Sequence, residues 1–205
     1  MSDIVVFRPG GNPPARDLAG WGLRAAGLIQ HGAAHALAAD HQGSAATSGA
    51  VATSLPNCRA ALFFCHGAAD KLMARGVALW DSGSAAYAQG LIVIAIACSS
   101  ARRLGPAAVS AGADAYLGFD DKLVWLTGDP HGRFGDAAVA PVACLAGGGD
   151  AAAARAALEN GFDVAFAFYR SSPANVTASD AVIAWLAASW NRGHVQLHGN
   201  PRAAL

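Results

Sequence analysis

The segment Leu91–Ala97 constrains the fold of this chain more than any other part of its sequence. All of its residues are apolar, and most of them are β-branched. A short continuous apolar run of this kind is typical of a β-strand that is buried on both faces. Such strands occur in parallel sheets covered by helices on either side. The segment therefore predicts an α/β fold with a central parallel strand.

Further strands are expected around this one. The apolar segments 4–7, 60–65 and 115–119 predict strands, and 195–197 predicts a short last strand. Stretches long enough for helices separate most of them, which indicates βα units and a mostly parallel sheet flanked by helices on both faces. We find no internal repeat and no linker, so we expect residues 1–205 to form a single α/β domain.

Two helices are predicted in the first half of the chain. Apolar residues at spacings of three and four predict a helix over 14–39. Pro106 fits the first turn of a second helix, and Gly112 fits its end. The segments 40–57 and 122–149 carry no pattern from which we assign secondary structure.

Two more helices are predicted towards the C-terminus. Asp150 fits the N-cap of a helix over 151–160, and Gly161 fits its end, after which 162–169 matches either a strand or a resumed helix. The last helix begins at Thr177 or Ser179 and ends at Gly193. Five of its apolar residues fall on one side: Val182, Ile183, Leu186, Ala187 and Trp190.

The composition excludes several classes of protein. With 54% hydrophobic and 14% charged residues, the chain is too apolar to be disordered. It has 14 basic and 14 acidic residues and no large basic cluster, so we expect no nucleic-acid partner. The N-terminus lacks the pattern of a signal peptide, and the longest apolar run is far shorter than the ~20 residues of a membrane span. Four cysteines are too few for a disulfide scaffold. We expect a cytoplasmic protein without a membrane partner.

Metal and cofactor motifs are missing from the sequence. There is no Cys-x-x-Cys pair, no P-loop, no Gly-x-Gly-x-x-Gly and no Gly-x-Ser-x-Gly. His31 and His35 lie four residues apart on the predicted helix, but no glutamate accompanies them as in the zinc motif His-Glu-x-x-His. We therefore expect neither a metal site nor a cofactor.

Two reactive residues follow predicted strands directly. His66 comes after the strand 60–65, and Cys98 comes after the central strand. Ligands of open α/β sheets bind outside the carboxyl ends of the strands, where an imidazole can promote the thiolate form of a cysteine. Gly67 lacks a Cβ, so its backbone N–H can approach a substrate oxygen as in an oxyanion hole. From the residues alone, an inert buried cysteine beside a structural histidine and a redox-sensing thiol at Cys98 remain alternatives.

The segments around these residues form an ordered set of motifs. Leu62–Gly67 is an apolar strand that ends in His-Gly, Ile94–Ser100 is one that ends in Ala-Cys-Ser-Ser, and Ala111–Phe119 has the form Gly-Ala-x-Ala-Tyr-x-Gly. Together with Val195–Pro201, they resemble the caspase-like superfamily of cysteine peptidases, in particular its prokaryotic CHAT and gingipain-type members. The resemblance implies a three-layer sandwich.

The resemblance also implies a function, namely that of a cysteine endopeptidase. Cys98 would be the nucleophile that attacks a peptide carbonyl, and His66 would protonate the departing amine. The backbone N–H groups of Gly67 and Cys98 would hold the oxyanion. The implied partners are a protein or peptide substrate and a regulatory protein. The alternative is a catalytically inactive caspase-like module used for protein–protein interaction or signalling.

Three features depart from the family pattern. His66 lies 32 residues before Cys98, whereas caspases proper have their histidine ~50 residues upstream. Ser100 stands where glycine is frequent in the family, and Asn200 stands for the usual aspartate. The chain therefore resembles the wider superfamily rather than caspases proper.

Charged residues near the predicted site offer two contacts for substrate. Asp120 and Asp121 follow the strand 115–119 and are placed to receive a basic P1 side chain, although a solvated turn is the alternative. Arg102 follows the nucleophile and is placed to lower the thiol pKa or to accept an acidic P1 side chain. Its alternative is a charged loop that covers the sheet edge.

Overall fold

The computed structural model describes residues 3–32 and 34–205. Its main sheet has the strand order β2-β1-β3-β7-β8-β9, in which neighbouring strands run parallel except for β9, which is antiparallel to β8. In chain order these strands are β1 (Ile4–Arg8), β2 (Leu37–Gln42), β3 (Ala60–Phe64), β7 (Ile92–Ile96), β8 (Ala115–Phe119) and β9 (Val195–Gly199). The predicted strands are confirmed, and the segment that we placed at the centre, β7, lies between β3 and β8.

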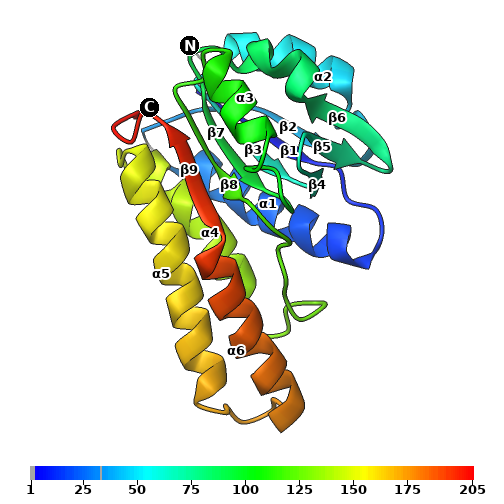
Figure 1. The fold of residues 1–205 in the computed structure, drawn as a ribbon, viewed down its shortest axis with the longest axis vertical. Helices are drawn as coiled ribbons and strands as arrows, with labels where there is room; N and C mark the ends of the chain where they lie inside the picture. Colours follow the sequence, from blue (N-terminus) through cyan, green and yellow to red (C-terminus); the bar gives the residue numbers. More distant parts are fainter. Residues whose placement is uncertain (1–2, 33) are drawn as a thin grey trace.

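Helices cover both faces of the sheet (Figure 1). They are α1 (Pro13–His31), α2 (Ser48–Ser54), α3 (Leu104–Ser110), α4 (Arg133–Ala146), α5 (Ala151–Arg170) and α6 (Ala178–Gly193). Short 3-10 helices span Gly43–Ala45, Leu55–Asn57 and Ser82–Ala88. A smaller antiparallel sheet follows β3 directly and consists of β4 (His66–Ala68), β5 (Lys71–Ala74) and β6 (Val77–Asp81). None of the described helices is long and apolar enough to cross a membrane.

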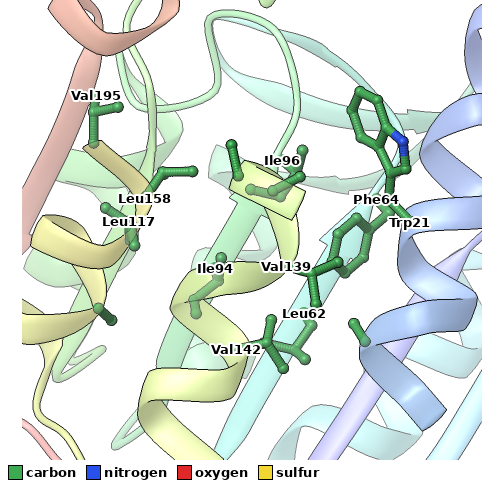
Figure 2. Packing of buried hydrophobic residues seen from close by; sticks show 14 of the residues in the cluster. Trp21, Leu62, Phe64, Ile94, Ile96, Leu117, Val139, Val142, Leu158 and Val195 are labelled. Carbon is green, nitrogen blue, oxygen red and sulfur yellow. The ribbon is translucent and has the colours of Figure 1, made fainter. Parts of the chain in front are cut away.

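The alternation of side chains along the strands divides the interior into two cores. Leu62, Ile94 and Leu117 point to the face covered by α1, α4 and α5, where they meet residues such as Val139, Val142 and Leu158 (Figure 2). Their strand neighbours point to the other face, covered by α2, α3 and the small sheet. Each fully buried aliphatic or aromatic side chain contributes about 1.5–3 kcal/mol. The three-layer α/β sandwich with a mostly parallel sheet is thereby confirmed.

The first predicted helix is too long. α1 ends at His31, and Gly32 adopts an extended conformation with its N–H bonded to the carbonyls of Leu28 and Ile29. Residue 33 lies outside the described residues. Residues 37–42 form the edge strand β2 instead. The sequence did not indicate this strand, because it is only partly buried and lacks the clear alternation of apolar and polar residues that identifies a strand. His35 therefore shares no helix face with His31 and lies beside Asp3.

The predicted helix end at Gly161 is also wrong. α5 continues to Arg170, so that 162–169 is helical rather than a strand. Gly161 lies where α5 crosses α4, and a Cβ at this position would be 2.5 Å from the Cα of Ala137. The glycine therefore allows two helices to approach closely and does not end one.

The limits of the last helix are confirmed, but its apolar side is not buried. Thr177 is the N-cap, and its hydroxyl accepts a hydrogen bond from the N–H of Asp180 at 3.1 Å. The side that packs inward carries small residues: Ala181, Ala184, Ala187 and Ala188. The larger residues are 45–51% exposed: Val182, Ile183, Leu186 and Trp190. Only Ala187 of the predicted stripe is buried. Figure 1 shows the reason, since α5 and α6 project beyond the sheet, which leaves the outer side of α6 uncovered.

Segments without a sequence pattern contain regular structure. The region 40–57 includes α2, whose N-cap Thr47 accepts a hydrogen bond from the N–H of Ala50 at 3.1 Å. The region 122–149 includes α4. Neither helix is apparent from the sequence, because α2 has only seven residues and α4 contains Pro141.

Replacement of Gly161 with alanine tests the close approach of α4 and α5. Alanine favours a helix interior over glycine by about 1 kcal/mol, yet we expect Gly161→Ala to destabilise the protein by about 1–3 kcal/mol, since the added methyl group meets the backbone of α4. Urea unfolding monitored by circular dichroism measures the change.

Gly20 supplies the matched control. It lies within α1 and is exposed, and a Cβ added at this position would have no other atom within 4 Å. Gly20→Ala should therefore stabilise the protein by about 0.5–1 kcal/mol. Equal effects of the two substitutions would contradict the proposed packing.

Candidate active site

The segments that follow β1, β3, β7 and β8 meet at one edge of the sheet, where the parallel strands have their carboxyl ends. β3 pairs with β7 so that Phe64 lies opposite Ile96, and His66 and Cys98 each follow two residues later. Both residues line a cleft of about 260 Å³. Its other lining residues are Pro14 and Leu18 of α1, Ala97, Leu123, Val124, Trp125 and Thr127. The cleft lies where ligands bind in open α/β sheets.

Cys98 is partly buried in this cleft and carries an uncharged thiol. Its Sγ lies 3.9 Å from the carbonyl oxygen of Leu123, to which the thiol donates. Burial is the largest cause and raises the pKa of Cys98 above its ordinary value, against smaller lowering effects from neighbouring backbone groups. The resting side chain is therefore a thiol rather than a thiolate.

A strained turn follows Cys98. Ser99 has a φ of 55°, which a residue other than glycine rarely adopts. The turn is held by hydrogen bonds from the N–H of Ser99 to the carbonyl of Asp121 at 2.8 Å and from the N–H of Arg102 to the carbonyl of Ser99 at 3.1 Å. Ser100, which departs from the family pattern, is fully buried, and its Oγ donates to the carbonyl of Ala97 at 3.3 Å. Strain of this kind clusters at functional sites.

His66 is oriented by Asn12, which sequence analysis did not identify. Nε2 of His66 lies 2.9 Å from Oδ1 of Asn12, and the same oxygen accepts a hydrogen bond from the N–H of Ala15 at 3.2 Å as the N-cap of α1. Because a backbone N–H can only donate, the contacting atom of Asn12 is its acceptor oxygen. A neutral His66 therefore carries its hydrogen on Nε2, which leaves Nδ1 as the basic nitrogen.

An asparagine before Pro13-Pro14 is a recognisable N-cap signal. That signal predicts the start of α1. It contains nothing about a histidine 54 residues away, so the contact between Asn12 and His66 could not be found from the sequence.

Gly67 lies against the backbone of Cys98. A Cβ at Gly67 would collide with the carbonyl oxygen of Cys98, so only glycine fits here. β4 and β5 are joined by the two-residue turn 69–70, and Gly67 pairs with Leu72 next to the closing pair of the hairpin. Because hydrogen-bonded and non-bonded pairs alternate in an antiparallel ladder, the N–H of Gly67 points away from β5. The N–H of Gly67 is therefore not bonded to β5, and Gly67 itself is not among the residues that line the cleft.

The charged residues suggested for substrate contact do not line the cleft. Asp120 accepts hydrogen bonds from Nε2 of Gln196 at 3.0 Å and pairs with Nδ1 of His194 at 2.7 Å. Oδ1 of Asp121 accepts the N–H of Lys122 at 2.7 Å. Arg102 is exposed at the surface. The structure therefore brings His66 and Cys98 together in the cleft, with Gly67 against the backbone of Cys98. It places Asp120, Asp121 and Arg102 outside the cleft.

One wall of the cleft comes from the segment 123–127, which carried no sequence signal. Nε1 of Trp125 donates to Oδ2 of Asp17 at 2.9 Å, and its ring packs edge-on against Trp21 at 5.2 Å. The backbone N–H and carbonyl of Val124 both bond to the buried side chain of Asn191, at 2.9 and 2.6 Å. These contacts hold the 123–127 segment against the body of the protein.

Neither metal ligands nor disulfides are found in the described part of the chain. It contains no group of three or more histidine, cysteine, aspartate or glutamate side chains that could hold a metal ion. Cys58, Cys65, Cys98 and Cys144 are all free.

The strand order, the antiparallel last strand and the placement of the cleft define a caspase-like α/β fold. The chain is similar to the complex of Porphyromonas gingivalis RgpB pro- and mature domains, with a TM-score of 0.60, 10% identity, and coverage of 100% of this chain and 48% of that chain. It is also similar to the Arg specific cysteine proteinase gingipain R, with a TM-score of 0.59, 8% identity, and coverage of 99% and 47%.

The chain thus spans about half the length of the gingipain chains that it matches. No protein-family model matches the sequence, and no curated protein matches it. The resemblance to the caspase-like superfamily is confirmed at the level of the fold.

The raised pKa of Cys98 predicts how its alkylation depends on pH. Because burial disfavours the thiolate, iodoacetamide should react slowly with Cys98 at pH 7, and the rate should rise about tenfold per pH unit up to pH 9. Mass spectrometry of peptides containing each cysteine measures the rates. Burial raises the pKa of Cys58 to about 11 and that of Cys65 to about 12, so these thiols should react more slowly still. A rate for Cys98 that is already constant below pH 7 would indicate a preformed thiolate and contradict this prediction.

Proposed function

We propose that this protein is a cysteine endopeptidase that uses Cys98 as nucleophile and His66 as proton carrier. The observation that supports it most is the presence of both side chains in one cleft, at the carboxyl ends of neighbouring strands of a caspase-like fold. The substrate is a protein or peptide. All four cysteines are free, in keeping with a reducing compartment such as the cytoplasm.

The first half of the reaction forms an acyl-enzyme. Sγ of Cys98 attacks the carbonyl carbon of the scissile peptide, and the thiol proton passes to Nδ1 of His66. The tetrahedral intermediate collapses as His66 donates this proton to the departing amine, so that the C–N bond breaks and a thioester remains. Because Cys98 rests as a thiol, proton transfer accompanies the attack rather than preceding it.

The second half releases the acid. His66 accepts a proton from water, and the resulting hydroxide attacks the thioester carbonyl. The C–S bond breaks, and the proton returns from His66 to the sulfur, which restores both side chains. Each proton taken up by His66 is thus given back within the same half-reaction.

The N–H groups of Gly67 and Cys98 are the proposed oxyanion hole. The carbonyl oxygen becomes negative in both tetrahedral intermediates, and backbone donors fixed before the reaction stabilise that charge. The close approach of Gly67 to the Cys98 backbone supports this role, since it holds the two groups at one side of the nucleophile. Removal of one such donor typically slows the reaction by about 10²–10³.

Asn12 is the proposed positioning residue. Its amide oxygen keeps the hydrogen of a neutral His66 on Nε2, which leaves Nδ1 free to accept the thiol proton. When His66 becomes protonated, the same oxygen accepts a charge-assisted hydrogen bond from its Nε2–H. This bond stabilises the imidazolium formed during the attack.

The arginine specificity named for gingipain R is not carried over to this chain. A basic P1 side chain requires a carboxylate in the pocket that receives it. Asp120 and Asp121, the residues suggested from the sequence, bond elsewhere and do not line the cleft.

A peptidyl electrophile tests the nucleophile and its partner. An acyloxymethyl ketone should label Cys98 stoichiometrically, and Cys98→Ala should abolish both labelling and peptide cleavage. His66→Ala should lower the labelling rate by about 10²–10⁴, the usual contribution of an acid–base group. Cys144→Ala is the matched control, because Cys144 lies on α4 outside the cleft, and it should leave both rates unchanged.

Other results would support the rival functions. Labelling of Cys98 that is no faster than that of Cys144 would favour a catalytically inactive interaction module. Peroxide-dependent oxidation of Cys98 without any peptide cleavage would favour a redox sensor.

Two substitutions of Asn12 separate its two contacts. Asn12→Ser keeps a good N-cap for α1 but is too short to reach His66, so stability should be retained while kcat falls about tenfold, the equivalent of one hydrogen bond. Asn12→Ala should lower kcat similarly and also destabilise the protein by about 1 kcal/mol. The pH profile of kcat should shift in both variants, and unchanged profiles would exclude the positioning role.

A further inference from the structure

The cleft beside the proposed dyad is apolar. Apart from the two reactive side chains, its walls are formed by Pro14, Leu18, Leu123, Val124 and Trp125, with Ala97 between the strands. Thr127, which is exposed at the surface, is the one further lining residue with a polar side chain. Among the described residues that line the cleft there is no aspartate, glutamate, lysine or arginine.

Two acidic residues adjacent in sequence or contact to the cleft walls, Asp17 and Asp121, are bonded to the protein itself. Oδ2 of Asp17 accepts hydrogen bonds from Nε1 of Trp125 at 2.9 Å and from the N–H of Gly128 at 2.8 Å. Asp17 therefore holds the indole ring of Trp125 and the backbone of Gly128 in place. The carboxylate of Asp121 bonds to the backbone of Lys122. A charged substrate group in the cleft would meet hydrocarbon rather than a free counter-charge, which is costly.

The apolar walls are held in place before any ligand binds. Trp125 is fixed at its indole nitrogen by Asp17 and at its ring by Trp21. Val124 is fixed by Asn191, which is fully buried and bonds to both backbone groups of that residue. Polar contacts behind the walls thus leave their apolar surfaces facing the cleft. A preformed slot of this kind loses little entropy on binding.

We propose that this slot is the S1 pocket, which receives the P1 side chain of the substrate. It selects an apolar side chain of the size of leucine, methionine or phenylalanine. The inference rests on the proposed function, since it takes Cys98 and His66 as the point where the scissile bond lies. The volume of about 260 Å³ is below the about 300–1,000 Å³ of typical small-molecule sites. It suits one large side chain together with its adjacent backbone.

The size of the expected preference follows from the chemistry of the walls. An apolar pocket distinguishes side chains that differ by a few methylene groups by about 10- to 200-fold. It disfavours a charged side chain by about 100-fold or more, because the charge loses its water without gaining a partner. Leucine, methionine and phenylalanine should therefore rank above alanine, and alanine above arginine and aspartate.

Acyloxymethyl ketones of one peptide sequence, with P1 varied among these six residues, measure the preference directly. The second-order rate constants for labelling Cys98, read by intact mass, should follow that order in the wild-type protein. Fastest labelling by the arginine probe would overturn the inference. If that labelling were lost in Asp17→Asn, Asp17 would be identified as the receptor of a basic side chain.

A matched pair of variants tests whether the slot itself sets the preference. Thr127→Asp introduces a carboxylate at the exposed rim of the cleft and should raise the rate for the arginine probe about tenfold while lowering that for leucine. Thr53→Asp places the same charge on α2, away from the cleft, and should change neither rate. Equal effects of the two substitutions would show that P1 does not enter the slot.

A binding measurement separates this inference from the proposed function. If no probe labels Cys98, the proposed function fails. Fluorescence anisotropy with Cys98→Ala and labelled peptides ending in leucine or arginine then still decides the chemistry of the slot. Tighter binding of the leucine peptide by about tenfold or more supports an apolar slot, and equal or reversed affinities exclude it.

Discussion

The parallel pairing of β3 with β7 is the contact on which the candidate site depends. Both strands are buried on both faces, so a shift of one residue would move every side chain from one core to the other, and the register is therefore strongly specified. In this register the segments that follow β3 and β7 leave the sheet at the same level, which brings His66 and Cys98 into one cleft. The lack of a Cβ at Gly67 lets the chain after β3 rest on the backbone of Cys98. The site is thus a consequence of how two apolar strands fit together.

The apolar surroundings disfavour one requirement of the proposed reaction, a thiolate nucleophile, and favour another, stabilisation of the oxyanion. They raise the pKa of Cys98, which disfavours a resting thiolate, so the proposed reaction requires proton transfer from the thiol to His66. They also form the slot proposed to select the substrate, and they exclude water, which strengthens the interaction of backbone N–H groups with a developing oxyanion. The polar residues Asp17 and Asn191 lie behind this surface and hold it. The proposed substrate selection and the raised pKa of the thiol therefore have the same physical origin, the apolar walls of the cleft.

The buried strands of the main sheet were predictable because their signals are local, whereas the partly buried edge strand β2 was missed. Each buried strand is an apolar run, and the run that forms β7 alone indicates a covered parallel sheet. Predictions failed where a single residue has two possible roles. Gly161 was expected to end a helix, but it serves the crossing of α4 and α5, which depends on a neighbour 24 residues away in the chain. The apolar side of α6 was identified correctly, yet the packing of its alanines against the rest of the protein leaves that side exposed.

The sequence by itself determined the α/β class, the central strand and the three residues His66, Gly67 and Cys98 that meet at its edge. These follow from patterns between residues close together in the chain. Only the tertiary structure decided that Asn12 orients His66 and that Trp125, fastened by Asp17, forms the wall of the cleft. The partners in these contacts are 54 and 108 residues apart, and each is an ordinary residue in its own segment. Their roles depend on where the folded chain places them, because a hydrogen bond requires proximity in space and leaves no local trace in the sequence.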